Sequence, residues 1–360
     1  MTTTDHIALD HVALHPSGAR LRVPSFAVIS GAQVQQTVLG RQKNIVQVVQ
    51  DAYRLHGAGL TVNPPSSFLR FPDRRSSRII GLPASLGGTA PVDGMKWISS
   101  FPENVAFGIP RASAVLILND PATGYPFACL ESSIISAART AASAALAADR
   151  LSRGRSRPAR IGFFGAGLIA RYVHTYLAST GWNFEELGVH DLAPSSASGF
   201  RTYLEQTAAT GRITVHDSAE ELVRTSDLLV FATIASRPHV TDPSWFAHHP
   251  LVLHLSLRDL APQVLLASTN IVDDIDHCLR AETSPHLTER LTGSRAFLAG
   301  TLDDVLAGRV APPPDRTTVF SPFGLGVLDL AVGKYVYDEV ARRGELRIIE
   351  DFFHELNRYG

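Results

Sequence analysis

The feature that most constrains this chain is a glycine-rich turn between an apolar strand and a helix. Residues 165–170 read Gly-Ala-Gly-Leu-Ile-Ala, directly after the apolar run ARIGFF. In such a unit the first glycine permits the tight turn, the second lets a pyrophosphate approach the backbone, and the small last residue permits close packing of the helix. The turn therefore predicts dinucleotide binding through Gly165 and Gly167; a purely structural glycine turn is the alternative.

An acidic residue follows at the end of the next predicted strand. Asp191 closes the run ELGVHDL, 26 residues after Gly165, where a carboxylate can bind the hydroxyls of an adenosine ribose. The following LAPSSAS contains no arginine, so a 2′-phosphate would be repelled there. The pattern favours NAD over NADP as the cofactor.

Strands and helices alternate beyond this turn, at SDLLVFAT, HPLVLHLSL and TNIVDDID, which is typical of βαβ units and a parallel sheet. Before it, β-rich runs between Arg78 and Asn119 predict a small sheet with a hairpin at NDPATGYP. The Ala-rich segment SSIISAARTAASAALAADRL predicts a helix capped by a serine. The segment 321–344 has helical spacing and is expected to pack back on the first part of the chain.

These patterns predict an α/β fold with two domains, which a length of 360 residues accommodates. A Rossmann-type doubly wound parallel sheet is expected over residues 151–316. An α+β domain is expected over residues 1–150 and 317–360, completed by the C-terminal helix. The linker RGRSRP and the segment APPPDR (311–316) mark the boundaries.

Composition excludes several classes of protein. The 33 Lys and Arg against 34 Asp and Glu leave a net charge of −1, so no basic field attracts nucleic acid. No apolar run is long enough to span a bilayer, and the N-terminus lacks the pattern of a secretory signal. We therefore expect a soluble, cytoplasmic protein without nucleic-acid or membrane partners.

Metal binding is not expected either. Cys129 and Cys278 have no CxxC partner, which argues against a disulfide framework and a thiolate zinc site. Four histidines stand close together in the sequence, but no carboxylate or cysteine completes a ligand spacing. They are His239, His248, His249 and His254.

Two charged residues are candidates for chemistry. Asp259 lies three residues after the strand PLVLHLS, near the edge where open α/β sheets bind ligands; it is either a general base or the N-cap of the next helix. Lys96 lies in the middle of a predicted strand and is one of only three lysines. Its ammonium is expected to face a ligand or water, or else the strand is an edge strand. Arg70, Arg111 and Arg139 are candidates for carboxylate binding, although spacing alone does not select them.

Several segments together resemble the ornithine cyclodeaminase/mu-crystallin family over roughly residues 60–340. They are GMKWISSFPEN, RASAVLILNDPATGYPFACLESSIISAARTAASAALAA, GAGLIA, the strand-end Asp259, and SPFGLGVLDLAVGKYVYDE. Within the family, the sequences of these segments are most similar to the branch that serves 2,3-diaminopropionate biosynthesis. The resemblance implies a homodimer whose N-terminal segment and C-terminal helix form a substrate-binding and dimerisation domain around a central NAD domain.

The resemblance also assigns roles to residues. It places substrate binding at Arg70, Lys96 and Arg139, with Arg74, Arg75 and Arg78 as neighbouring alternatives to Arg70, and it makes Asp259 and Lys96 catalytic. The implied cofactor contacts are Arg111, Arg139, Gly165, Gly167, Leu168, Ile169, Asp191, Thr233 and Ser256. Two positions depart from the cyclodeaminases: Arg111 replaces a threonine, and Gln263 replaces a lysine.

The function implied is an NAD-dependent oxidation at a CH–NH bond. In this reading, N-(2-amino-2-carboxyethyl)-L-glutamate is cleaved to 2,3-diaminopropionate and 2-oxoglutarate with formation of NADH, for a siderophore or a peptide antibiotic. Ornithine cyclodeamination, or another amino-acid dehydrogenase or ketimine reductase reaction of the family, is the first alternative. A non-catalytic NAD(P)H-binding protein similar to the crystallins is the second.

Overall fold

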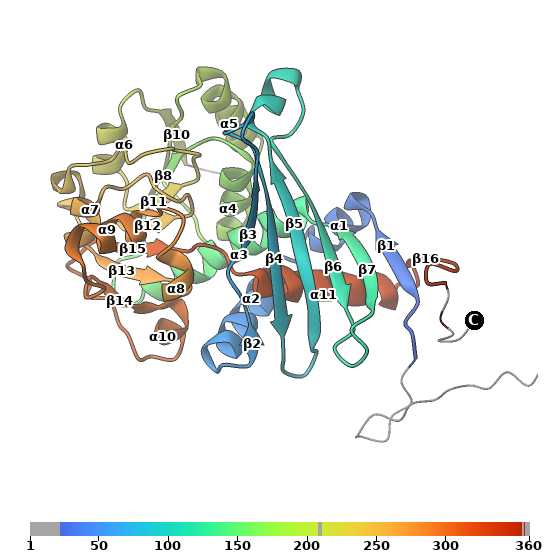
Figure 1. Cartoon of the computed structure of the whole chain (residues 1–360). Helices are drawn as coiled ribbons and strands as arrows, with labels where there is room; N and C mark the ends of the chain where they lie inside the picture. Colours follow the sequence, from blue (N-terminus) through green and yellow to red (C-terminus); the bar gives the residue numbers. More distant parts are fainter. Residues whose placement is uncertain (1–21, 208–210, 355, 357–360) are drawn as a thin grey trace, which may run out of the picture.

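The computed structural model describes residues 22–207, 211–354 and 356, and it contains two eight-stranded sheets. Figure 1 shows the two sheets side by side, the long strands of one next to the shorter, helix-covered strands of the other. One sheet contains β1 to β7 together with the C-terminal strand β16, and the other contains the consecutive strands β8 to β15. The predicted α/β fold is confirmed.

The first sheet, called the mixed sheet below, has the order β16-β1-β7-β6-β5-β4-β2, with β3 also paired to β4. Its neighbours are antiparallel except for the parallel pair β1 and β7. The predicted hairpin joins β6 to β7, where the Asp120 carboxylate accepts from the backbone N–H of Thr123 at 2.8 Å. The strands are β1 (Phe26–Ile29), β2 (Thr61–Val62), β3 (Ser67–Arg70), β4 (Arg78–Leu86), β5 (Val92–Ser100), β6 (Ala112–Asn119), β7 (Pro126–Glu131) and β16 (Arg347–Ile349).

Helix α11 (Gly326–Arg342) packs against β4, β5 and β6, as Figure 1 shows. A glycine permits this close approach, because a Cβ at Gly333 would lie 2.1 Å from Cδ2 of Leu116. The expectation that the C-terminal segment packs back on the first part of the chain is therefore confirmed. The other helices of this part are α1 (Gly31–Val38), α2 (Gln42–Gly57) and the 3-10 helix η1 (Pro102–Phe107).

The Ala-rich helix α3 (Ser133–Leu151) lies between the two sheets and contacts α2, α4, α11 and β12. Its alanines are buried on most sides of the helix, as expected for a helix without a solvent face. A serine, Ser132, is the N-cap residue as predicted, but its side chain makes no cap hydrogen bond. The Glu131 carboxylate replaces it, accepting from the backbone N–H groups of Ser133 at 2.7 Å and Ile134 at 3.3 Å.

The second sheet is entirely parallel, in the order β10-β9-β8-β11-β12-β15-β13-β14. Its central strands are apolar runs buried on both faces, the pattern expected for a parallel sheet covered by helices. The order reverses between β8 and β11, which creates a crevice at their carboxyl ends where such sheets bind ligands. The strands are β8 (Arg160–Phe164), β9 (Glu186–His190), β10 (Arg212–Val215), β11 (Leu228–Phe231), β12 (Leu251–His254), β13 (Thr269–Val272), β14 (Leu298–Thr301) and β15 (Thr318–Ser321).

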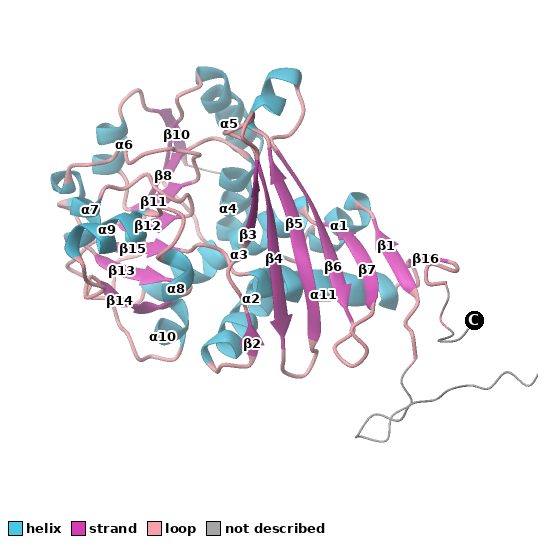
Figure 2. Cartoon of the chain, in the orientation of Figure 1, coloured by secondary structure: helices cyan, strands magenta, loops and turns pink. Residues whose placement is uncertain are grey.

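Helices cover both faces of this sheet, as Figure 2 shows. They are α4 (Leu168–Ser179), α5 (Pro194–Gln206), α6 (Ala219–Thr225), η2 (Pro243–Phe246), α7 (Pro262–Leu266), α8 (Ile275–Cys278), α9 (Ser284–Thr292) and α10 (Leu302–Leu306). Among the described residues, no helix has the length and apolarity needed to cross a membrane.

The expected boundary at 316/317 needs one correction. Strand β15 begins at Thr318 and pairs with both β12 and β13 inside the parallel sheet. The Pro-rich segment before it is thus a connection within this half of the molecule. We propose that the domain boundary lies after Ser321, where the chain crosses to α11.

Candidate functional site

The glycine turn joins β8 to α4 at the crevice of the parallel sheet. Gly165 has φ +84°, and a Cβ there would lie 2.7 Å from the carbonyl oxygen of Ala232 on the neighbouring strand connection. Gly167 is the N-cap of α4 and carries no capping side chain, and a Cβ there would meet nothing within 4 Å. The first backbone N–H groups of α4, beginning at Leu168 and Ile169, are therefore not capped by a side chain of Gly167, and such a helix N-terminus is a suitable site for a phosphate.

Asp191 follows β9 and is tied to this turn. Its Oδ2 accepts from the N–H of Ala166 at 2.8 Å, and its Oδ1 accepts from the N–H of Ala193 at 2.8 Å. A carboxylate has about four acceptor sites, so half of its capacity remains for the hydroxyls of a ribose. The residue types of this turn fit a dinucleotide.

A second polar group surrounds Asp259, after the carboxyl end of β12. Its carboxylate is fully buried and accepts from the hydroxyls of Thr233 and Ser256. Nε2 of His239 lies 3.1 Å from Oδ1. His254 is oriented differently, because its Nε2 accepts from the backbone N–H of Asp259 at 3.3 Å while its Nδ1 faces Ser321 Oγ at 3.1 Å.

One of the two interpretations of Asp259 is excluded by the structure. The N-cap of α7 is Ala261, so the capping alternative is wrong. Burial by itself raises the pKa of Asp259, but its contacts with His239, His254 and Ser256 outweigh that effect and hold the pKa well below its usual range. Asp259 is therefore a buried carboxylate at the ligand-binding edge whose surroundings stabilise its ionised form.

A third group is formed by Lys96 on β5, Arg139 on α3 and Asp329 on α11. Nζ of Lys96 donates to Oδ2 of Asp329 at 2.6 Å and to Ser136 Oγ at 3.2 Å. Nε of Arg139 donates to the other oxygen, Oδ1, at 3.2 Å. This contact leaves both Nη atoms of Arg139 for a ligand; they lie over the backbone of Gly324, where a Cβ would be 2.6 Å from Nη1.

The structure excludes both a water-facing ammonium and an edge strand for Lys96. β5 lies between β4 and β6, so the edge-strand alternative is wrong, and the side chain is only 2% exposed, so its ammonium does not face water. Burial lowers the pKa of Lys96 to about 8, and the carboxylate of Asp329 offsets only part of that effect. Asp329 is a site residue that the sequence reasoning missed; the sequence signal was a single acid inside the apolar helical run GVLDLAVG.

Four arginines gather near this end of the mixed sheet. In the strand register Arg70 stands opposite Arg78, and Arg78 stands opposite Ser100. Ser100 is four residues beyond Lys96 on the same strand. The side chains of Arg70, Arg78 and Ser100 therefore lie on the same face of the sheet as that of Lys96. Nη1 of Arg111 donates to Ser100 Oγ at 2.6 Å, which brings a third guanidinium to this face.

The fourth guanidinium comes from the other sheet. Arg258 precedes Asp259, and its Nη2 donates to the carbonyl oxygen of Ala281 at 2.9 Å. Burial, and then the positive charges of Arg111, Arg70 and Arg258, lower the pKa of Arg78. Within the described ranges none of the four pairs with a carboxylate. We call Arg70, Arg78, Arg111 and Arg258 the arginine group. The sequence analysis named Arg78 only as a neighbouring alternative to Arg70, and it missed Arg258.

The other candidates lie elsewhere. Arg74 pairs with Asp73 at 3.4 Å and lies 4.2 Å from the ring centroid of Phe71, while Arg75 is exposed. Gln263 is exposed on α7. Groups of three or more His, Cys, Asp or Glu that could hold a metal ion are absent from the described part of the chain.

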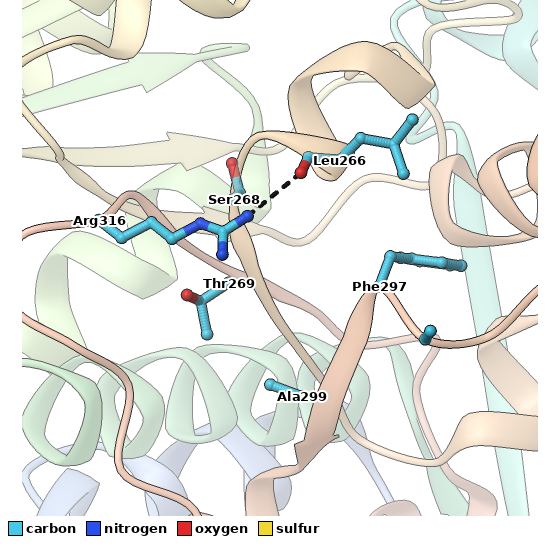
Figure 3. A pocket seen from close by; sticks show the side chains of 7 residues that line it. Leu266, Ser268, Thr269, Phe297, Ala299 and Arg316 are labelled. Atoms are coloured by element: carbon cyan, nitrogen blue, oxygen red, sulfur yellow. Dashed lines mark hydrogen bonds between the residues drawn. The ribbon is translucent and has the colours of Figure 1, made fainter.

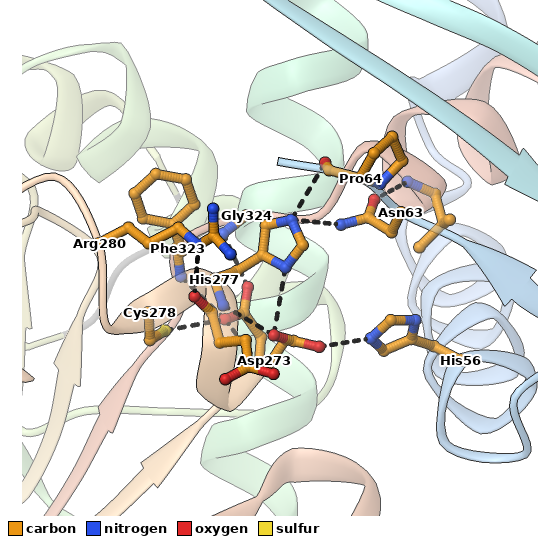
Figure 4. A network of polar contacts seen from close by, with 12 residues as sticks. His56, Asn63, Pro64, Asp273, His277, Cys278, Arg280, Phe323 and Gly324 are labelled. Atoms are coloured by element: carbon orange, nitrogen blue, oxygen red, sulfur yellow. Dashed lines mark hydrogen bonds and ion pairs between the residues drawn. The ribbon is translucent and has the colours of Figure 1, made fainter. Parts of the chain in front are cut away.

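A buried polar network joins the two halves near the site, as Figure 4 shows. The Asp273 carboxylate accepts from the N–H of Gly324 at 2.7 Å, which holds the crossing from β15 to α11. Asp274 contacts Nε2 of His56 on α2 at 3.0 Å and Nδ1 of His277 at 3.1 Å. Burial raises the pKa of Asp274, but the hydrogen bonds from His277 and His56 outweigh it and hold that pKa well below its usual range.

A surface pocket lies at the opposite edge of the parallel sheet, beside the amino ends of β13, β14 and β15, lined by Leu266, Thr269, Phe297 and Arg316. Figure 3 shows the guanidinium of Arg316 bound to the carbonyl oxygen of Leu266, at 3.2 Å. Because ligands bind at the carboxyl ends of such strands, the candidate site is the crevice and not this pocket.

Comparison with known proteins agrees with this geometry. The model of the ornithine cyclodeaminase/mu-crystallin family matches residues 28–344. The N-((2S)-2-amino-2-carboxyethyl)-L-glutamate dehydrogenase of Staphylococcus aureus is 25% identical over 323 residues, covering 88% of this chain and 95% of the relative. The alanine dehydrogenase of Archaeoglobus fulgidus is 28% identical over 301 residues, covering 81% and 89%.

Among solved structures, the Δ1-pyrroline-2-carboxylate reductase of Thermococcus litoralis, in complex with NADH and L-proline, superimposes with a TM-score of 0.82. It is 23% identical, and the match covers 90% of this chain and all of that one. The likeness extends through both sheets, and it establishes the fold.

Proposed function

The chain belongs to the ornithine cyclodeaminase/mu-crystallin family, and we propose that it catalyses the NAD-dependent oxidative hydrolysis of N-(2-amino-2-carboxyethyl)-L-glutamate. Its relatives are named dehydrogenases and reductases of amino acids and imines, and it is an oxidoreductase acting on a CH–NH bond. The proposed products are L-2,3-diaminopropionate, 2-oxoglutarate and NADH, with one water consumed.

The arginine group is the observation that carries this choice of substrate. Four guanidiniums without carboxylate partners repel one another, and the partial burial of Arg78, Arg111 and Arg258 is costly until an anion neutralises them. The proposed substrate carries three carboxylates, whereas ornithine carries one carboxylate and a terminal ammonium that this group would repel. The site therefore favours an acidic amine over the substrate of a cyclodeaminase.

The position of Arg258 separates this anion site from the phosphate site. The glycine turn follows β8, and Arg258 follows β12, two strands away. Two strand spacings amount to about 10 Å. We infer that the pyrophosphate binds at the turn and that Arg258 lies near the reacting end of the substrate.

When bound, NAD supplies the acceptor for the hydride that leaves the α-carbon of the glutamate half. The chain itself supplies binding and orientation. The free Nη atoms of Arg139 form a fork for one carboxylate, while Asp329 and Lys96 beneath it fix the direction of that fork. Arg78 and Arg258 bind a second carboxylate, which holds the reacting carbon in place. The polar group around Asp259 moves protons and activates the water that hydrolyses the imine.

We also propose a homodimer that forms through the mixed sheet. Leu69, Trp97 and Val115 share its outer face by register and remain 46%, 40% and 41% exposed. A second copy covering this face would bury them. We further infer, from the resemblance to the diaminopropionate branch, a cytoplasmic role in siderophore or peptide-antibiotic biosynthesis.

Turnover of a small panel of amines tests the proposed function. Purified enzyme with NAD is given the diaminopropionate–glutamate adduct, L-ornithine, L-alanine or L-proline, and NADH is measured by absorbance and the products by mass spectrometry. We expect stoichiometric NADH, 2-oxoglutarate and diaminopropionate from the adduct only. Cyclisation of ornithine without net NADH, or NADH binding without turnover of any amine, would contradict the proposal.

Variants of the arginine group sharpen the test. Arg78→Met and Arg258→Met each remove a charge-assisted contact of about 1.5–3 kcal/mol, equivalent to roughly a 10- to 100-fold loss in kcat/KM. The matched control is Arg75→Met, an exposed arginine near Arg78, which should retain wild-type kinetics. Equal kinetics in all three variants would show that Arg78 and Arg258 do not bind the substrate.

A further inference from the structure

The carboxylate of Asp259 is not itself positioned to meet a substrate. The residue is 0% exposed, and its two oxygens already accept from Thr233, Ser256 and His239. A carboxylate that is stabilised in this way is a weak proton acceptor. The group that exchanges a proton with a ligand is therefore expected to be a neighbour of Asp259.

His239 is the exposed member of this arrangement. Its side chain is 38% exposed while its Nε2 lies 3.1 Å from Oδ1 of Asp259. The backbone fixes the pair as well, because the N–H groups of His239 and Val240 donate to the carbonyl oxygen of Asp259 at 2.9 and 3.0 Å. The ring lies 6.2 Å from that of Phe164, at the end of β8, and thus at the crevice.

The neighbouring histidine does not compete for this role. His254 is 0% exposed, and both of its ring nitrogens are occupied: Nε2 lies 3.3 Å from the backbone N of Asp259 and 3.5 Å from its Oδ2, and Nδ1 lies 3.1 Å from Ser321 Oγ. Of the two imidazoles around the carboxylate, only that of His239 has a ring nitrogen available to a ligand. A buried carboxylate that orients an accessible imidazole is an arrangement suited to general acid–base catalysis.

We propose that His239 exchanges the proton with the bound substrate and that Asp259 is the positioning residue that fixes its tautomer and orientation. The carboxylate accepts a hydrogen bond from the protonated Nε2 of His239. The lone pair of Nδ1 is then available to the substrate. The assignment rests on the proposed function for the identity of the amine, but the hydrogen-bonded pair does not.

The proton steps balance as follows. As the α-C–H bond breaks with transfer of hydride to NAD, the N–H proton of the substrate goes to Nδ1 of His239 and a C=N bond forms; the exposed ring then releases that proton to solvent. Nδ1 next takes a proton from water while the water oxygen bonds to the imine carbon. The ring passes this proton to the nitrogen, which gives a carbinolamine. When the C–N bond then breaks, the hydroxyl proton of the carbinolamine moves through Nδ1 to the leaving nitrogen as the carbonyl of 2-oxoglutarate forms, so both protons of the water end on the released amine.

The kinetic arm of the test compares His239→Gln with His249→Asn. Glutamine retains an N–H donor for Asp259 but exchanges no proton, whereas His249 is an exposed histidine at the amino end of β12, with φ +59°, which asparagine tolerates. With whichever amine of the panel the wild type turns over fastest, we expect His239→Gln to lower kcat by roughly 10²- to 10⁴-fold, to lose the acidic limb of the pH profile, and to bind NADH normally. Turnover within threefold of the control would overturn the proposal.

The second arm needs no turnover. Nitrogen NMR of the histidine rings should place the proton of His239 on Nε2 in the wild type and redistribute it between the two nitrogens in Asp259→Asn, while Asp259→Glu should restore it in part. If the His239 tautomer is the same in the wild type and in Asp259→Asn, the proposed positioning role of Asp259 is wrong. If the adduct is not turned over, the proposed function fails, and this arm still decides the relation of the two residues.

Discussion

Replacing Asp329 by asparagine removes the only carboxylate from a buried group of three charged side chains. Lys96 Nζ and Arg139 Nε donate to it at 2.6 and 3.2 Å, and the Lys96 and Asp329 side chains are 2% and 0% exposed. Removing one partner of a buried pair costs about 3–5 kcal/mol, because the other charge is left uncompensated. We expect Asp329→Asn to lower the free energy of unfolding by that amount, because both cations lose their partner. Lys96→Met should also lower it, but by less, because Arg139 still pairs with Asp329.

A double-mutant cycle measured by urea unfolding tests this reasoning. With a slope of about 3 kcal/mol/M, a cost of 3–5 kcal/mol lowers the urea midpoint by roughly 1–1.7 M. The double variant Lys96→Met/Asp329→Asn buries no unpaired lysine or aspartate charge, so its cost should fall short of the sum of the single costs by at least about 2 kcal/mol. Single costs below about 1 kcal/mol that add without coupling would show that the three side chains are not arranged as described.

Three further predictions concern the cofactor, the assay pH and the joint between the halves. Asp191→Ala should weaken NAD binding and relax the discrimination against NADP, as measured by fluorescence titration with both; unchanged NAD affinity would exclude Asp191 from the site. Because the pKa of Lys96 is lowered to about 8, its positive charge is lost as pH rises through that value, and kcat/KM should fall there in the wild type but not in Lys96→Arg, if that variant folds. Asp274→Asn should lower the stability at pH 7 by about 1–3 kcal/mol. Because the pKa of Asp274 is lower in the folded protein than in the unfolded chain, its carboxylate stabilises the fold above the unfolded pKa, and this stabilisation is lost as the pH falls. Wild-type and variant melting curves should therefore converge below about pH 4.

The parallel half was largely predictable from sequence because its signals are local. The strand, the glycine turn and the acid that follows Gly165 occur in one continuous segment, and each local preference agrees with the final fold. Asp259 was also predictable, since its place after an apolar strand puts it at the ligand-binding edge.

The partners of these residues were not predictable, because they depend on contacts between distant segments. Lys96 and Asp329 are 233 positions apart, and only the packing of α11 on β5 brings them together. His239 is 20 positions from Asp259, in a connection whose course the pattern does not specify. Strand register, which places Arg78 opposite Arg70 and Ser100, likewise requires knowledge of which strands pair.

The position of α3 limits how this protein can be divided. Its alanines Ala137, Ala141, Ala144 and Ala148 have no exposed surface, and the helix contacts elements of both halves. A fragment that ends at Leu151 would expose one side of this helix to water, and a fragment that begins after it would lose the layer against which α4 and β12 pack. Chimaeras that exchange cofactor modules between relatives therefore have to transfer the residues that face α3 together with the module, and the two halves have to be expressed as one polypeptide.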